Sequence, residues 1–419
     1  MTDGKFINTK LWKYPNLFIV VMTLFFLVFF IIQNINGRFW LHDFEVYYSA
    51  ANSFLSGTQV YKVLYCLGSG YYKYSPFALL IYIPLSILPF TIAKIIYFFL
   101  LAGLIICTII FANALVSQYL FKTTINNPGH KILFFTALIV SFQVYYELHL
   151  GNVNILLLLV FLGSLHLLLK NKEYKAGILI ALGILIKPHF IVLLPLLLLR
   201  KKFKSFLTFF VTFITGLLLP ALFVGIKQNN ELHRQWFSAM SAHNTSLTDS
   251  QDTIYSWLYR LMFRSIYTDA GNELAYYILF FIACLVLIFI LADMRTEKKH
   301  PGNNYLINSN FVFEYLVILA MIPNITSTDS EHFLLSIPLI IFMLNYLFNN
   351  GRDMKIIIIS VIVFLFFGGN WRDLIGKTLA SWLTDNGILG LSNIFIIAIS
   401  LYIFFNQRKA ELLSQEIRT

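Results

Sequence analysis

The chain has 419 residues, of which 58% are hydrophobic and only 12% are charged. A soluble domain is typically about 45–50% apolar and about 25% charged, so this composition excludes an ordinary soluble protein. The net charge of +11 would suit a nucleic-acid-binding protein, but most of the 31 Lys and Arg residues stand in short connections between long apolar stretches. Such clusters mark the cytoplasmic ends of membrane spans. The charge therefore indicates topology, and we expect no nucleic-acid partner.

The long apolar stretches predict an all-α, polytopic helical membrane protein. A helix needs about 20 apolar residues to cross the bilayer. Lipid offers no partners to backbone groups, so a span must be helical or belong to a closed barrel, whose alternating strands this sequence lacks. The first stretch, about 14–33, is too long for the apolar core of a signal peptide and precedes no small-residue cleavage site, so we interpret it as a retained helix.

In chain order, we predict about 12 crossings, with both termini in the cytoplasm and the whole chain, residues 1–419, forming one membrane-embedded domain. Residues 76–90 are apolar but are interrupted by prolines, so we expect them only to dip into the membrane. The predicted helices cover approximately residues 14–33, 92–116, 131–147, 152–170, 176–187, 189–199, 205–226, 273–293, 309–323, 331–348, 356–368 and 388–406.

The first long polar interruption, residues 34–75, is expected to be external. Apolar residues from Trp40 to Leu55 recur at the spacing of one helix face, and Gly57 follows as a stop signal. This pattern predicts a helix lying against the membrane. Asp43 stands on its first turn and shares a face with Tyr47, four residues on.

Residues 176–199 are flanked by basic residues at both ends, which a single crossing cannot explain. Pro188 interrupts the stretch in its middle. We therefore predict two short helices with Lys187 at the turn between them, at membrane depth. Such a turn is tolerated only where it lines a water-filled cavity.

On this path the polar clusters around Asp43, Asn152, Asn154 and His332 all face the external side, which predicts one external cavity. Each cluster also has a simpler explanation. Asp43 is as well suited to capping a helix N-terminus as to acting as a base. Lys187 suits an anionic lipid headgroup, but a lysine can also extend its ammonium group to the interface.

The other candidate site residues also have a simpler, structural explanation. His332 begins an apolar stretch and could be an interface residue. Asn152 could cap the helix that follows it. Lys73 stands among tyrosines, an arrangement common at membrane boundaries. The three cysteines, Cys66, Cys107 and Cys284, lack the spacing of a zinc site, so we predict no metal site and no disulfide framework.

Taken together, these clusters resemble glycosyltransferase family 87, the polyprenyl-phosphate-sugar-dependent mannosyltransferases of the GT-C superfamily. The resemblance covers roughly residues 40–340. Asn152 replaces the glutamine that is more usual in the family. The matching motifs are Asp43-Phe44-Glu45-Val46-Tyr47-Tyr48-Ser49-Ala50-Ala51 with Gly57, Tyr72-Lys73-Tyr74-Ser75-Pro76, Gly151-Asn152-Val153-Asn154, Ala176-Gly177 with Lys187-Pro188, and Pro323 with His332.

The resemblance implies a GT-C fold and an inverting hexosyltransferase that moves a sugar, in this family most often mannose, from a polyprenyl-phosphate donor to a lipid-linked or cell-envelope glycan. It implies that Asp43 is the general base and that no cofactor is needed. Donor phosphate would be bound by Lys187 and His332, and sugar or acceptor by Tyr47, Lys73, Asn152 and Asn154. The family also implies a multi-pass protein of the bacterial inner membrane whose active site faces the periplasm or exterior.

Two other functions remain open from the sequence. A transporter or flippase for lipid-linked saccharides would share the buried lysine and the broken helices, but its polar groups would need access from both sides. A ligase or polymerase for lipid-linked glycans would use similar lipids and a similar cavity.

Overall fold

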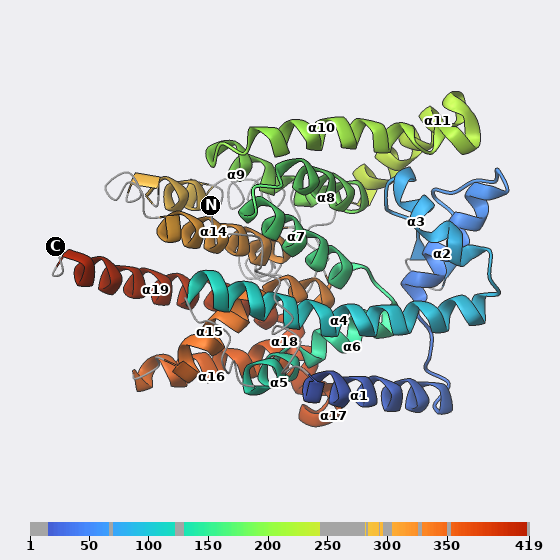
Figure 1. Cartoon of the computed structure of the whole chain (residues 1–419). Coiled ribbons are helices and arrows are strands. Elements are labelled where there is room, and N and C mark those ends of the chain that lie inside the picture. The colour runs from blue at the N-terminus through green and yellow to red at the C-terminus, as the bar shows by residue number, and fades with distance from the viewer. Residues whose placement is uncertain are drawn as a thin grey trace, which may run out of the picture. The chain divides into compact units, whose positions relative to one another are not determined.

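The computed structural model (Figure 1) describes residues 16–66, 70–121, 130–243, 281, 284–292, 294–295, 304–325, 329–349 and 353–416. The chain divides into two compact units. We name them after one residue each. The Asp43 unit comprises residues 20–108 and 144–246, and the His332 unit comprises residues 1–19, 109–143 and 247–419.

The Asp43 unit holds most of α1 (Asn16–Ile35), the larger part of α4 (Phe90–Leu120) and the end of α6 (Ser141–Leu150). Its other elements are α2 (His42–Leu55), β1 (Leu64–Cys66), β2 (Gly70–Tyr71), α3 (Pro76–Ser86), α7 (Asn154–Leu169), α8 (Glu173–Ile186), the 3-10 helix η2 (Pro188–Leu193), α9 (Leu194–Leu199), α10 (Phe203–Leu218) and α11 (Ala221–His243).

The His332 unit holds the remaining parts of α1, α4 and α6, and the helices at the C-terminal end of the chain, drawn in orange to red in Figure 1. Its other elements are α5 (His130–Ile139), α14 (Asn304–Ile325), the 3-10 helix η4 (Ser330–Ser336), α15 (Ile337–Asn349), α16 (Met354–Gly368), α17 (Arg372–Ile375), α18 (Lys377–Asp385) and α19 (Ile388–Glu416).

The all-α membrane fold is confirmed. Within the described residues, 5 helices are long and apolar enough to cross a membrane, or up to 7 if each bent pair is one span. The expected count of 12 stays a prediction, since much of the stretch 273–293 lies outside the described residues. The single expected domain also stays a prediction.

Several helices of the chain carry exposed apolar side chains. On α1, Leu17, Leu24 and Phe25 are each more than half exposed, and on α16 Leu365 is 66% exposed. Side chains of this kind would be costly in water and are at home against lipid. The burial pattern therefore agrees with a multi-pass membrane protein.

The helix predicted after the first span is confirmed as α2, and the apolar stretch behind it forms the short helix α3, which packs on α2. In the chain, an antiparallel hairpin of β1 and β2 stands between these helices, and no pattern in the sequence predicts it. It pairs Leu64 with Tyr71 and Cys66 with Gly70.

The predicted break at Lys187 is confirmed. Helix α8 ends at Ile186, Lys187 is extended (φ −126°, ψ 103°), and Pro188 begins η2. Helix α8 then packs closely on α10, because Gly177 has no side chain. A Cβ atom at this position would lie 2.8 Å from the Cβ of Thr208. The Ala-Gly pair is thus explained by helix packing.

Two predicted crossings are wrong as single straight helices. The stretch 205–226 is divided into α10 and α11, which are bent by 90° relative to each other. Pro220 lies in the break between them, and Gly225 (φ 80°, ψ 159°) introduces a kink inside α11. Residues 227–243, which follow the predicted span, are helical and form the part of α11 after this kink. The stretch 131–147 is divided into α5 and α6, bent by 63°.

Candidate functional site

Asp43 lies on the first turn of α2, and an unusual backbone fixes where this helix begins. The N-cap residue, Leu41, has a left-handed conformation (φ 53°), which a leucine rarely adopts. Its N–H donates to the carbonyl of His149 on α6 at 3.1 Å. Asp43 therefore stands inside the helix and is not the N-cap residue, so capping does not explain its carboxylate.

The turn before α7 brings Asn152 against α2. Gly151 has a positive φ of 72°, and a Cβ atom there would lie 2.9 Å from the Cβ of Phe44. Only glycine meets both requirements without strain. The turn can thus lie directly on α2, where the next residue, Asn152, reaches Asp43.

Asn152 bonds with both ends of its side-chain amide. Its Nδ2 donates to Oδ2 of Asp43 at 2.8 Å, and its Oδ1 accepts from the backbone N–H of Val153 at 2.7 Å. Val153, and not Asn152, is the N-cap residue of α7. These contacts hold the Asp43 carboxylate in one orientation, an arrangement that suits a group used for proton transfer.

Two tyrosines continue this set of contacts. The hydroxyl of Tyr74 donates to Oδ1 of Asn152 at 3.4 Å, and the hydroxyls of Tyr74 and Tyr47 are 2.9 Å apart. Tyr47 is only 5% exposed. Burial, followed by the nearby Tyr74 and the Asp43 carboxylate, raises the pKa of Tyr47 well above its ordinary value. Tyr47 therefore remains a neutral hydrogen-bonding group.

Lys187 is buried at the break after α8, with 5% of its surface exposed. Its Nζ donates to Oδ1 of Asn154 at 2.7 Å. An ammonium group in this position is not extending to the lipid–water interface. Asn154 is the first residue of α7, so the same turn that supplies Asn152 also supplies the partner of Lys187.

Glu147 completes this second set of contacts and is fully buried. One carboxylate oxygen accepts from Nδ2 of Asn154 at 2.9 Å, and the other accepts from the backbone N–H of Ile155 at 2.8 Å. A carboxylate only accepts, and an ammonium group only donates. Glu147 and Lys187 therefore fix the Asn154 amide in one orientation between them.

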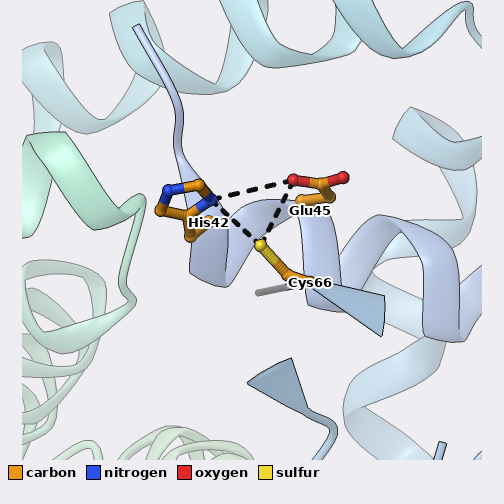
Figure 2. A group of neighbouring side chains, drawn as sticks. All are labelled: His42, Glu45 and Cys66. Atoms are coloured by element: carbon orange, nitrogen blue, oxygen red, sulfur yellow. Dashed lines mark hydrogen bonds and ion pairs between the residues drawn. The ribbon is translucent and has the colours of Figure 1, made fainter. Parts of the chain in front are cut away.

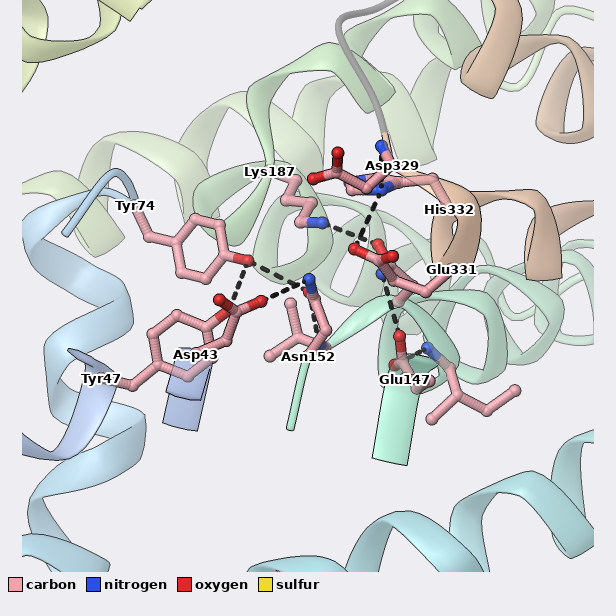
Figure 3. A network of polar contacts seen from close by, with 12 residues as sticks. Asp43, Tyr47, Tyr74, Glu147, Asn152, Lys187, Asp329, Glu331 and His332 are labelled. Carbon is pink, nitrogen blue, oxygen red and sulfur yellow. Dashed lines mark hydrogen bonds and ion pairs between the residues drawn. The ribbon is translucent and has the colours of Figure 1, made fainter. Parts of the chain in front are cut away.

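The two sets of contacts meet at Tyr74 (Figure 3). The Nζ atom of Lys187 lies over the Tyr74 ring, 5.7 Å from its centre. Tyr74 also bonds Asn152, which in turn bonds Asp43. A carboxylate and a cation, predicted separately from the sequence, are thus joined by one group of polar side chains within the Asp43 unit.

Lys73 and His332, the other two predicted site residues, have contacts of a different kind. Lys73 is half-buried, and its backbone carbonyl accepts from the indole of Trp236 at 3.2 Å. His332 belongs to the His332 unit, where its backbone N–H donates to the Asp329 carbonyl at 3.1 Å and the N–H of Asp329 donates to the His332 ring at 3.3 Å. The ring also lies 3.5 Å from a carboxylate oxygen of Glu331.

Comparison with known proteins identifies the family of this chain. The sequence model of glycosyltransferase family 87 matches residues 72–319, more than half of the chain. The chain belongs to glycosyltransferase family 87. The family match contains Tyr74, Glu147, Asn152, Asn154 and Lys187.

A curated relative of this family 87 chain is the alpha-(1->3)-arabinofuranosyltransferase of Corynebacterium glutamicum, which is 32% identical over 195 residues. The alignment covers 46% of this chain and 43% of the relative. The chain therefore matches less than half the length of this curated protein.

Sequence reasoning missed two members of the site. Glu147 is absent from the predicted site, although a carboxylate inside an apolar stretch is a signal that identifies such a residue. Tyr74 was grouped with the boundary tyrosines. Its distinct position follows only from the fold, which brings its hydroxyl to Asn152, 78 residues further along the chain.

Proposed function

We propose that this chain is a membrane glycosyltransferase that moves a sugar from a polyprenyl-phosphate donor to a lipid-linked or cell-envelope glycan at the external face of the bacterial inner membrane. The observation that carries the proposal is the joining of the Asp43 carboxylate to the Lys187 cation through Asn152 and Tyr74, with Asn154 accepting a hydrogen bond from Lys187. Membership of family 87 supports the reaction class.

In the proposed reaction, Asp43 acts as the general base. Its carboxylate takes the proton from an acceptor hydroxyl, and the hydroxyl oxygen attacks the anomeric carbon of the donor. A new carbon–oxygen bond forms as the bond between the anomeric carbon and the phosphate oxygen breaks, with inversion. General base catalysis of this kind contributes about 10²–10⁴ in rate.

The leaving polyprenyl phosphate gains negative charge as this bond breaks. A fixed cation in a water-poor site stabilises such charge strongly. Lys187 is buried and held by Asn154, so it needs little reorganisation to perform this task. We assign His332 to the same phosphate, as the family resemblance implies.

The amides and hydroxyls around the two charged groups would bind the sugar and acceptor. Asn152 and Asn154 offer hydrogen bonds to hydroxyl groups while they orient Asp43 and Lys187. Tyr47 stays protonated and offers a hydroxyl, and Lys73 is assigned to the same region from its place in the sequence motif. No cofactor beyond the donor is part of this proposal.

The donor sugar that we propose is mannose. A pentofuranose is the second candidate, and one observation favours it: the curated relative is named an arabinofuranosyltransferase. A transporter or flippase is less well supported, because the chain belongs to a glycosyltransferase family. A ligase or polymerase would use the same base and cation but would transfer a longer glycan.

The purified chain in sealed lipid vesicles should be incubated with radiolabelled polyprenyl-phosphate mannose and, separately, with polyprenyl-phosphate arabinofuranose, together with a membrane extract as acceptor. We expect Asp43→Asn to lower transfer by about 10²–10⁴-fold. The control Asp373→Asn makes the same change at an exposed carboxylate in the first turn of α17 and should transfer at the native rate. Undiminished transfer by Asp43→Asn would refute the base assignment, and movement of donor lipid across the bilayer without transfer would favour the transporter.

A further inference from the structure

A second group of chemically reactive side chains joins α2 to the strand β1 (Figure 2). The first turn of α2 also carries Asp43. His42 and Glu45 come from the first turn of α2, and Cys66 comes from the facing strand β1. None of the three takes part in the contacts that join Asp43 to Lys187 described above. Their ligand atoms all lie within 4.8 Å of one another.

The distances between these atoms resemble those around a bound metal ion. The Cys66 sulfur lies 3.0 Å from Nδ1 of His42 and 3.5 Å from Oε2 of Glu45, and the nitrogen and oxygen are 3.9 Å apart. Zinc bonds of about 2.0–2.3 Å in a tetrahedral arrangement place two ligand atoms about 3.3–3.5 Å apart. The group needs to move by only a few tenths of an ångström to surround an ion.

The chemistry of the three groups selects the class of ion. Imidazole and thiolate favour zinc-like transition metals, whereas calcium and magnesium take oxygen ligands. When Cys66 and Glu45 are deprotonated and His42 is neutral, the set carries two negative charges, which a divalent cation neutralises. Three protein ligands leave a fourth tetrahedral position for water or another group.

The fold holds the three groups together from independent elements. Helix spacing places His42 and Glu45 on one face, three residues apart. The hairpin delivers Cys66 at a position paired with Gly70, where a Cβ atom would lie 2.8 Å from the Cβ of Cys66. A glycine there lets the two strands approach, and β1 packs on α2. The side chains of His42 and Glu45 are about one third exposed, so an ion can reach them.

We propose that His42, Glu45 and Cys66 form a binding site for one zinc-class divalent cation, which ties β1 to the helix turn that carries Asp43. The sequence alone predicts no such site, since Cys66 is 21 residues from Glu45. The proposal concerns metal binding and is independent of sugar transfer.

Metal binding is measured on the full-length chain, reduced and stripped with a chelator, then dialysed against Zn²⁺ and analysed by elemental mass spectrometry. We expect about one zinc per chain. Titration with Co²⁺ should give a thiolate-to-cobalt absorption band. His42→Ala, Glu45→Gln and Cys66→Ser should each weaken binding at least about tenfold, since even residues that only support a metal ligand contribute 10–100-fold.

Cys107→Ser is the matched control, because Cys107 is exposed on α4 and has no part in the group. It should retain both the zinc and the cobalt band. Zinc should also raise the thermal midpoint of the native chain and of Cys107→Ser, but not that of Cys66→Ser. If the folded native chain binds no more zinc than Cys66→Ser does, the three groups only hydrogen-bond to one another and the proposal is overturned.

Discussion

Lys187 and Asn154 lie 33 residues apart in sequence and are joined by a hydrogen bond of 2.7 Å between Nζ and Oδ1. The bond crosses from the break after α8 to the first residue of α7. It fixes a cation that the chain would otherwise bury at considerable cost. The position of this cation relative to the Asp43 carboxylate is the basis of the proposed mechanism.

Replacing Lys187 by methionine should preserve much of the side-chain volume and remove the charge. We expect Lys187→Met to lower transfer by about 10²–10³-fold, the usual effect of losing one group that stabilises transition-state charge. Lys187→Arg should recover only part of the rate, because a planar guanidinium does not reproduce the single contact to Asn154. Initial rates measure both. The exposed Lys377→Met is the control, and equal rates in Lys187→Met and the control would contradict the assignment.

Glu147→Gln tests the buried carboxylate that orients Asn154. Glutamine has one acceptor oxygen, so either the amide of Asn154 or the N–H of Ile155 would face a donor instead. A buried donor without an acceptor costs about 1–3 kcal/mol. We expect a lower thermal midpoint and slower transfer, measured on the same preparation. Glu231→Gln, which changes an exposed ion pair with Arg234, should alter neither.

Asn152→Gln introduces the residue that is more usual in the family. The longer side chain keeps an amide donor for Asp43, so we expect transfer within about tenfold of the native rate. Asn152→Leu removes the hydrogen bond that Asn152 donates to Asp43 and the one that it accepts from Tyr74. A hydrogen bond to a charged group contributes about 1.5–3 kcal/mol and a neutral one about 0.5–1.5 kcal/mol. The transfer rate and thermal midpoint of Asn152→Leu should both fall. Similar behaviour of the two variants would argue against a hydrogen-bonding role.

The raised pKa of Tyr47 predicts a stability change at high pH. In the unfolded chain a tyrosine ionises near pH 10, whereas in the fold Tyr47 must remain neutral. The stabilisation from its buried neutral hydroxyl is therefore present below about pH 10 and is lost as the pH rises above it. The difference in thermal midpoint between the native chain and Tyr47→Phe should shrink above this pH. Tyr71→Phe, at a residue 45% exposed, is the control.

Gly177→Ala tests the close packing of α8 on α10. The added methyl group would meet Thr208 and the backbone of α10, and overpacking of this kind costs about 1–3 kcal/mol. The thermal midpoint should fall. Gly103→Ala is the matched control, since a Cβ atom at Gly103 has nothing within 4 Å. An unchanged midpoint for Gly177→Ala would mean that the two helices separate without cost.

Features that depend on residues close together in the sequence could be predicted. The apolar stretches indicate membrane helices because lipid cannot satisfy the backbone. The spacing from Trp40 to Leu55 predicts α2, and Pro188 predicts the break at Lys187 because proline cannot continue the hydrogen-bond pattern. Pro220, near the end of a predicted span, likewise lies in the break between α10 and α11.

The sequence by itself determined that this is a helical membrane protein with a carboxylate and a cation at unusual positions, since composition, periodicity and proline act locally. Only the tertiary structure decided which residues they meet. Asn152 reaches Asp43 across 109 residues, and Cys66 reaches His42 across 24. Such contacts depend on the angles at which whole helices pack and on glycines that permit close approach, and neither can be derived from local periodicity.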